Sequence, residues 1–280
     1  MSKTYPDFEG SVAVVTGAGG ILCSEFSKTI AQTKAKVALL DVNYDAVKQV
    51  ADEISAQGGI ALAIQCDVLN PESLKTAHQN ILEKFGACNI LLNGAGGNNK
   101  RATTTSEHYV CDGTNEVSFF DLKKEGIEFV FGLNFMGTLL PVQEFARDML
   151  TGKGNNTIIN ISSMNAFRPL TKIPAYSAAK AAISNFTQWL AVYLADKEIR
   201  VNALAPGFFS TKQTRPLFYK PDGTHTERYK KIISHTPMHR LGVPQDLDGT
   251  LLWLLDPDAS GFVTGVVVPI DGGFSAYSGV

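Results

Sequence analysis

Short, uninterrupted apolar runs alternate along the chain with longer segments in which apolar residues recur every three or four positions. Such runs predict strands buried on both faces, and the longer periodicity predicts helices. The apolar runs are residues 12–16, 36–41, 60–66, 89–92, 158–161, 201–204 and 266–270, and the helical segments are 21–34, 44–57, 71–85, 127–150, 175–196 and 244–255. This alternation predicts a Rossmann-type, doubly wound α/β fold, with a parallel sheet of about seven strands and helices on both faces.

Two segments have no clear period, residues 97–124 and 207–240. Each follows the carboxyl end of a predicted strand, which is where ligands bind in open α/β sheets. Long irregular segments of compact domains are usually lids or binding loops, and otherwise ordered insertions. We expect an insertion at 97–124 and a substrate lid at 207–240. No linker, repeat or low-complexity tract divides the chain, so residues 1–280 are expected to form a single domain.

The composition excludes several classes of protein. The 280 residues are 44% hydrophobic, too many for a disordered chain, and 25 Lys and Arg face 27 Asp and Glu. That balance gives no reason to expect a nucleic-acid or membrane partner. Neither a signal-like stretch nor a run of the ~20 apolar residues of a membrane helix is present, so we expect a cytoplasmic protein. The five histidines and four cysteines predict no metal site and no disulfide; the cysteines are Cys23, Cys66, Cys88 and Cys111.

A glycine-rich turn joins the first predicted strand to its helix. Gly17, Gly19 and Gly20 would let the backbone approach a pyrophosphate, which the helix N-terminus then attracts. An ordinary tight loop would look the same, but Asp41 ends the second strand about 20 residues later, where an acidic side chain binds adenosine ribose hydroxyls. A carboxylate there repels a 2′-phosphate. The pair therefore predicts a dinucleotide site that favours NAD over NADP.

Tyr176 and Lys180 are four residues apart in a predicted helix and share one of its faces. A unit charge ~4 Å away at a dielectric of ~20 is worth ~4 kcal/mol, or roughly three units of pKa. The ammonium of Lys180 is therefore expected to bring the pKa of Tyr176 towards neutrality, where a general acid or base works best. An exposed tyrosine–lysine pair with no catalytic role has the same spacing.

The chain resembles the short-chain dehydrogenases/reductases over nearly its whole length. The pieces that carry the resemblance are Thr16-Gly17, Asp67-Val68, Asn93-Gly94-Ala95-Gly96, Asn134, Ser162-Ser163, Tyr176 with Lys180, and Pro206-Gly207 followed by Thr211. The family is an NAD- or NADP-dependent group of oxidoreductases, and its members usually form tetramers through two long helices, here 127–150 and 175–196. The resemblance therefore implies an NAD-dependent enzyme that is a homotetramer.

The resemblance also implies a role for each matching residue. Tyr176 would be the general acid/base, Lys180 would lower its pKa and hold the nicotinamide ribose, and Ser163 would bind the substrate carbonyl. Asn134 would hold a water in a proton relay to Lys180. The implied cofactor contacts are Gly17, Gly19, Gly20 and Ile21 at the phosphates, Asp41, Asp67 and Val68 at the adenosine, Asn93, Ala95 and Gly96 along the floor, and Tyr176, Lys180, Pro206, Gly207 and Thr211 near the nicotinamide.

The glycine turn departs from the family pattern TGxxxGxG. Ile21 and Cys23 stand where the family has its second and third glycines, while Gly19 and Gly20 lie just upstream. The third glycine normally allows close helix packing, for which the small Cys23 is expected to suffice. We expect Gly19 and Gly20 to supply the close approach of the backbone to the phosphates.

Several stretches are similar to a narrower group of the family, the D-mannonate oxidoreductases or fructuronate reductases. They are TGAGGILCS, NGAGGNN, the insertion ending FFDL, SSMNAFRPLTKIPAYSAAK and the ending DGGFSAYSGV. The implied reaction is reversible hydride transfer between NADH and the ketone of D-fructuronate. A sugar acid needs a cation for its carboxylate, and we expect Arg168 or Lys172, with Arg101, to clamp it beside Asn165. The alternatives are another polyol, a ketogluconate or a β-ketoacyl substrate, or a non-catalytic NAD-binding sensor.

Overall fold

Seven parallel strands form the central sheet of the computed structural model, which describes residues 5–109, 117–151, 154–211 and 214–279. The strand order is β3-β2-β1-β4-β5-β6-β7. The strands are β1 (Val12–Thr16), β2 (Lys36–Asp41), β3 (Ile60–Gln65), β4 (Ile90–Asn93), β5 (Thr157–Ile161), β6 (Arg200–Pro206) and β7 (Val267–Ile270). The fold class and all seven predicted strands are confirmed, with strand ends shifted by at most a few residues.

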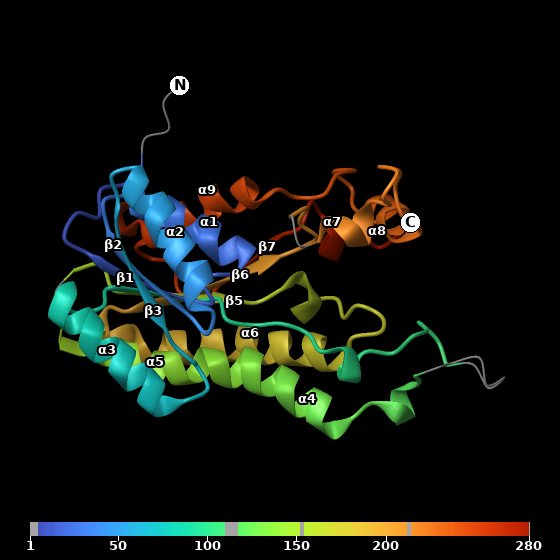
Figure 1. Ribbon diagram of the computed structural model, residues 1–280, viewed down its shortest axis with the longest axis horizontal. Coiled ribbons are helices and arrows are strands. Elements are labelled where there is room, and N and C mark those ends of the chain that lie inside the picture. The colour runs from blue at the N-terminus through green and yellow to red at the C-terminus, as the bar shows by residue number, and fades with distance from the viewer. Residues whose placement is uncertain (1–4, 110–116, 152–153, 212–213, 280) are drawn as a thin grey trace.

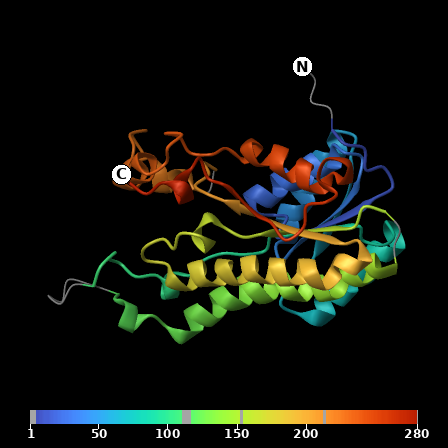
Figure 2. The same cartoon turned by 180° about the vertical axis from the view of Figure 1, so that it is seen from behind.

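Helices cover both faces of the sheet (Figure 1). On one face lie α1 (Ile21–Ala31), α2 (Tyr44–Ala56) and α9 (Asp248–Leu255), and on the other lie α3 (Pro71–Lys84), α5 (Gly137–Thr151) and α6 (Pro174–Leu194). Each layer buries its own apolar cluster: Phe26 and Leu251 belong to the first, Phe145 and Leu190 to the second. Figure 2 shows α5 and α6 running side by side beneath the sheet.

The strand order reverses between β1 and β4. From β1 the chain moves outward through β2 and β3, then returns to lay β4 on the other side of β1, with Thr16 opposite Asn93. At such a switch point the carboxyl ends of two strands diverge and leave a crevice between their loops. The glycine turn after β1 and the glycine-rich segment after β4 therefore enter the same crevice.

The helical parts of the chain differ from expectation in three places, one of them the predicted helix 244–255, which begins with a 3-10 turn at Pro244–Leu247 before α9. The predicted helix 127–150 is divided into α4 (Lys124–Phe131), a π-helical turn at Gly132–Met136, and α5. The segment 207–240, predicted to be irregular, contains α7 (Arg215–Phe218) and α8 (Glu227–Ser234). Its prolines led to this error because Pro216 lies in the first turn of α7, where proline is tolerated, and Pro221 precedes α8. The N-cap of α8, Thr226, accepts a hydrogen bond from the Tyr229 amide.

The described residues of segment 97–124 have little regular structure. They form two single 3-10 turns, Lys100–Ala102 and Phe119–Asp121. Residues 110–116 of the insertion, with Cys111, and residues 212–213 of the lid lie outside the described residues. The short helix α10 (Pro257–Ser260) follows α9. Among the helices of the described segments, none combines the length and apolar character needed to cross a bilayer.

Candidate active site

A cleft of about 300 Å³ opens at the switch point between β1 and β4. Most of the predicted cofactor contacts line it: Gly17, Gly20, Ile21, Asp41, Asp67, Val68, Ala95 and Gly96. The sequence did not single out four other lining side chains, Leu22, Val42, Cys66 and Leu133. Leu22, Val42 and Cys66 adjoin the glycine and acidic motifs in the sequence. Leu133 lies beside Gly97, at the end of the glycine-rich segment that follows β4.

The glycine turn has the geometry of an anion cradle. Gly17 adopts φ +66°, and a β-carbon there would lie 2.8 Å from the Cα atom of Ala95. Gly20 is the N-cap of α1 and has no side chain to cap the helix, whose first turn has no acidic residue. The first N–H groups of α1 are therefore free to meet an anion, which the positive end of the helix dipole also attracts.

Gly19 has a different place from the one predicted. Its N–H donates to Oδ2 of Asp41 at 3.1 Å, and a β-carbon on it would lie 2.8 Å from the β-carbon of Ala46 in α2. Gly19 thus packs against Asp41 and α2 and is not among the residues that line the cleft. The predicted close approach of the backbone to the cofactor phosphates therefore applies to Gly17 and Gly20, which line the cleft. The hydrogen bond from the Gly19 N–H helps to orient the Asp41 carboxylate.

Cys23 can stand where the family has its third glycine because the facing residue, Gly94, has no side chain. A β-carbon on Gly94 would lie only 2.1 Å from Sγ of Cys23. The thiol is buried, and burial raises its pKa to about 12, so it stays neutral at physiological pH. The glycine that the family has in the helix is therefore offset by a glycine in the facing loop.

Asn93 departs from its predicted role as part of the cofactor floor. Its side chain is buried, and Nδ2 donates to Oδ1 of Asn160 in β5 at 2.9 Å. Asn160 in turn donates to Oγ1 of Thr187 in α6 at 2.9 Å. The side chain of Asn93 thus ties β4 to β5 and α6, and Ala95 and Gly96 line the cleft in its stead.

The predicted catalytic residues meet at the Gly96 end of this cleft. A β-carbon on Gly96 would lie 2.7 Å from Oδ1 of Asn134 and 3.2 Å from Nζ of Lys180. Nζ of Lys180 donates to the carbonyl of Ile161 at 2.8 Å and lies 5.7 Å from the centre of the Tyr176 ring. Asn134, which is distant in the sequence, is therefore brought beside the Tyr176–Lys180 pair of α6.

The Ser163 hydroxyl lies beside the phenol of Tyr176, and its hydrogen bond lowers the pKa of that phenol. The larger effect on this pKa is burial, which raises it. The expected lowering by Lys180 is therefore wrong for the cofactor-free protein. The estimate from sequence assumed a direct approach of the ammonium, whereas Nζ is held by the Ile161 carbonyl. Ser162, in contrast, is turned away and donates to the carbonyl of Lys180 at 3.1 Å.

The side chain of Asn134 is hydrogen-bonded to backbone groups of neighbouring segments. Its Nδ2 donates to the carbonyls of Gly97 and Val130 at 2.7 Å each, and its Oδ1 accepts from the Gly97 N–H at 3.2 Å. These bonds fix the loop after β4 to the π-helical turn. The proton relay that the family resemblance implies stays a prediction.

The charge of Lys180 makes a testable contribution to stability. Burial lowers its pKa from 10.5 to about 8. Between these values the side chain of residue 180 binds more protons in the unfolded chain than in the folded one, so the contribution of Lys180 to the free energy of unfolding of the cofactor-free protein should rise from pH 8 to pH 10. Lys180→Met should lack this contribution, so the difference between wild type and variant should change with pH by at most about 1.4 kcal/mol per pH unit. Urea unfolding of both proteins across this range measures it, and parallel profiles would contradict it.

The remaining predicted cofactor contacts follow β6. Gly207 packs closely, since a β-carbon there would lie 2.7 Å from Cα of Asp271 and 3.4 Å from Sδ of Met164, the neighbour of Ser163. Pro206 ends β6 just before it. Thr211 pairs with Thr214, with 2.9 Å between the two Oγ1 atoms. These three residues are not in the lining of the cleft at the β1–β4 switch point.

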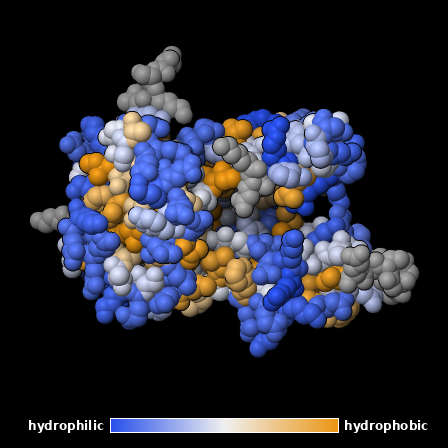
Figure 3. Space-filling view, viewed as in Figure 1, coloured by the Kyte–Doolittle hydropathy of each residue, from blue (hydrophilic) through white to orange (hydrophobic). Residues whose placement is uncertain are grey.

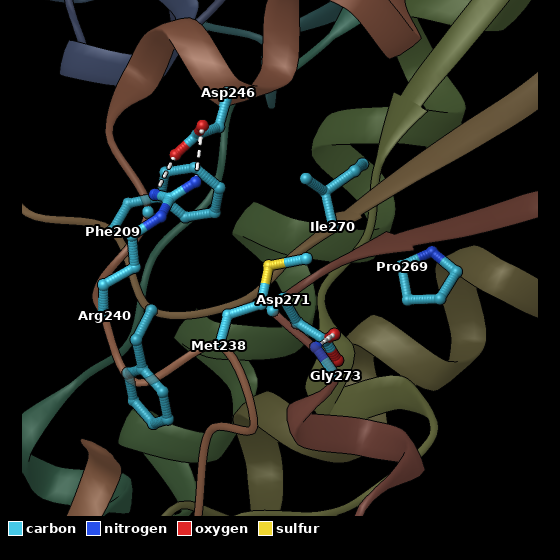
Figure 4. Close-up of a pocket in the computed structure, with 11 residues that line it drawn as sticks. Phe209, Met238, Arg240, Asp246, Pro269, Ile270, Asp271 and Gly273 are labelled. Atoms are coloured by element: carbon cyan, nitrogen blue, oxygen red, sulfur yellow. Dashed lines mark hydrogen bonds and ion pairs between the residues drawn. The ribbon is translucent and has the colours of Figure 1, made fainter.

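A second cavity, of about 350 Å³, lies between segment 208–246 and the end of β7 and has none of the predicted site residues in its lining (Figure 4). Its charged groups already have partners. Arg240 holds Asp246 through two contacts of 2.6 and 2.9 Å, and Asp271 accepts from the amides of Gly273 and Ser275. The first pair joins Arg240 to the turn before α9, and the second set of bonds holds the turn that follows β7.

The predicted substrate residues are distributed around the Ser163 loop. Asn165 is buried, with an Oδ1 that has no partner among the described residues, and its N–H donates to Oγ of Ser163 at 3.3 Å. Arg168 is tied to the C-terminal segment by a 3.0 Å bond to the Ser275 carbonyl. Arg101 packs instead against Gly126 of α4, so the two arginines have different neighbours. Lys172 accepts a hydrogen bond from the Thr104 amide through its carbonyl, at 2.9 Å.

The comparisons with known proteins agree with this site. Residues 11–222 match the sequence profile of the family described as short chain dehydrogenase. An uncharacterized oxidoreductase from Haemophilus influenzae is 56% identical over 276 residues, which covers 98% of this chain and 96% of the relative. The chain belongs to the short-chain dehydrogenases. The family that its motifs resemble is thereby confirmed, and with it the class of enzyme, an oxidoreductase.

Two further similarities cover the whole short-chain dehydrogenase fold. An uncharacterized oxidoreductase from Bacillus subtilis is 50% identical over 280 residues, covering 100% of both chains. A crystal structure from Haemophilus influenza, provisionally identified as a D-mannonate oxidoreductase and containing bound NAD, matches with a TM-score of 0.95 at 55% identity over 98% of each chain. The arrangement of elements described above is therefore shared along the entire chain.

Proposed function

We propose that this short-chain dehydrogenase interconverts D-fructuronate and D-mannonate with NAD(H). The observation that carries the proposal is the meeting of Ser163, Tyr176 and Lys180 at one end of the dinucleotide cleft, since Gly96 lines the cleft and also touches Lys180. The choice of substrate is supported by the similarity to the relative identified with D-mannonate and by the sequence stretches around the site.

Each residue has a physical reason for its proposed part. Gly17, Gly20 and the start of α1 bind the diphosphate, and Asp41 accepts from the ribose hydroxyls and repels a 2′-phosphate. When bound, the dinucleotide supplies or takes up the hydride. Ser163 donates a hydrogen bond to the ketone oxygen. In reduction the phenol of Tyr176, whose pKa burial raises, gives its proton to the same oxygen and becomes a phenolate; in oxidation the phenolate takes the proton of the substrate hydroxyl.

A panel of ketones tests this function. Purified protein with NADH should reduce D-fructuronate with a kcat/KM about 10²-fold above that for D-fructose, because a site built for a polar group rejects the analogue that lacks it. NADH absorbance measures the rates, and NADPH should support little turnover. Faster reduction of a neutral polyol ketone, a ketogluconate or a β-ketoacyl thioester would establish the alternative substrate class. NAD binding with no turnover on any ketone would establish a sensor.

We also infer a homotetramer. Trp189, Val192 and Tyr193 on α6 are 57%, 81% and 68% exposed, and Trp189 stacks on Tyr193 with 4.9 Å between ring centres. Contiguous exposed apolar groups of this size mark interfaces between proteins. Trp189→Glu should reduce the mass measured by light scattering from that of a tetramer to that of a dimer or monomer. A wild-type protein that is monomeric would contradict the inference.

A further inference from the structure

An ion pair joins the two irregular segments that border the active site. Nζ of Lys231, in α8 of the lid, lies 2.6 Å from each carboxylate oxygen of Glu107 in the insertion. The two residues are 124 positions apart in the sequence, so their pairing depends entirely on the fold. Figure 3 shows a hollow between the part of the molecule that carries α7 and α8 and the part that carries α4, and this pair connects the two parts.

The pair is close to the loop that leads to Tyr176. Three residues before Glu107, the amide of Thr104 donates to the carbonyl of Lys172 at 2.9 Å, and Lys172 lies in the segment between Ser163 and α6. The insertion is thus fixed to the loop that carries the proposed catalytic groups. The cationic end of Lys231 therefore reaches from the lid towards the same region as Lys172.

Three groups lower the pKa of the Glu107 carboxyl: Lys231 through its hydrogen bonds and its charge, and Lys172 and His108 through charge. The carboxylate of Glu107 is therefore held by Lys231 and lies within the electrostatic reach of Lys172. Lys172 also has φ +73°, a left-handed conformation that is uncommon for a lysine.

We propose that Lys172 and Lys231 form the site for the carboxylate of the substrate, and that Glu107 occupies this site when no substrate is bound. The proposal rests on the proposed function, which requires an acidic substrate. A substrate carboxylate has the same charge and the same pair of oxygens as Glu107 and can replace it on the lysines. The Glu107 side chain is 32% exposed and can be released to water. The lid is then fastened to the substrate instead of to the insertion.

This assignment revises the predicted clamp of Arg168 or Lys172 with Arg101. Arg168 already donates to the Ser275 carbonyl, and Arg101 packs against α4. Lys231 was not a candidate, because nothing in the sequence brings α8 near the insertion. Lys172 keeps its predicted part.

Three variants, with a matched control, test the site. Lys172→Gln and Lys231→Gln should each weaken binding of D-mannonate to the NAD-loaded protein about tenfold, with no change for the neutral polyol D-mannitol. Glu107→Gln should strengthen D-mannonate binding severalfold, because it removes the internal competitor. Lys230→Gln removes the same charge from the neighbouring position of α8, where Lys230 pairs with Glu227 at 2.7 Å, and should change neither affinity. Calorimetry measures all four.

The outcomes separate this site from the function on which it rests. Lysine variants that keep wild-type affinity for D-mannonate would overturn the site alone. If Glu107→Gln weakened the binding of D-mannonate and of D-mannitol alike, the ion pair would only support the lid. That result would also overturn the proposed carboxylate site. The proposed function is tested on the wild-type protein alone. If that protein reduces only neutral ketones, the proposed function is wrong, and the carboxylate site is wrong with it. Should the wild type prefer another keto acid, the same variants are compared on that acid and its neutral analogue.

Discussion

Replacing Tyr176 with phenylalanine will reduce turnover by about 10²- to 10⁴-fold, the contribution of a well-placed general acid or base. The change removes one oxygen and keeps the ring, which packs beside a small apolar cluster that includes Ala175 and Ala179. Burial raises the pKa of the phenol, so the wild-type group is protonated near neutral pH and can donate to the ketone oxygen. Phenylalanine has no proton to give, and water, a much weaker acid than a phenol, is a poor substitute.

Two measurements keep this result distinct from a loss of folding or cofactor. NADH binding, followed by its fluorescence, should change little, because the substitution removes one contact at the nicotinamide end and leaves the diphosphate cradle at the other end of the cleft intact. Tyr193→Phe makes the same chemical change at a 68% exposed position of the same helix and should keep wild-type turnover. Turnover of Tyr176→Phe within about tenfold of wild type would show that another group transfers the proton.

The sheet was predictable from the sequence because its central strands are covered on both faces. Every residue of β1 and β4 is buried, so each strand is a continuous apolar run that no amphipathic helix would show. The cleft was predictable for a related reason. The motifs that line it end consecutive parallel strands, and in a doubly wound sheet these ends must lie on one edge. Residues such as Gly17 and Asp67 therefore meet without further information.

Features that depend on packing between distant segments were not predictable. Asn93 follows the strand pattern of its neighbours, and only the position of Asn160 shows that its side chain faces into the protein. The pKa of Tyr176 depends on where the Lys180 ammonium is held, which helix spacing alone does not give. The contact of Glu107 with Lys231 joins two segments without periodicity. In each case the deciding quantity is a tertiary distance.

Replacing Gly94 with alanine will destabilise the protein by about 1–3 kcal/mol, as overpacking of a filled interior does, and will weaken NADH binding about tenfold or more. The new β-carbon would lie 2.1 Å from Sγ of Cys23 and 3.1 Å from the Thr16 carbonyl. The amides of Gly94 and Ala95 also donate to Oγ1 of Thr16, so the loop cannot retreat without losing these bonds. Cys23 and Gly94 both line the cleft, and either displacement alters it.

A second substitution should undo most of this damage. Cys23→Ala in the Gly94→Ala protein removes the sulfur, which leaves the Thr16 carbonyl as the nearest atom, and should recover most of the stability and of the NADH affinity. Gly97→Ala is the matched control, since its β-carbon would meet only Cδ2 of Leu133 at 3.7 Å. Thermal unfolding and NADH fluorescence on the four proteins of the cycle give the coupling energy. Additive effects of the two substitutions would mean that the cysteine in the glycine position is not accommodated by Gly94.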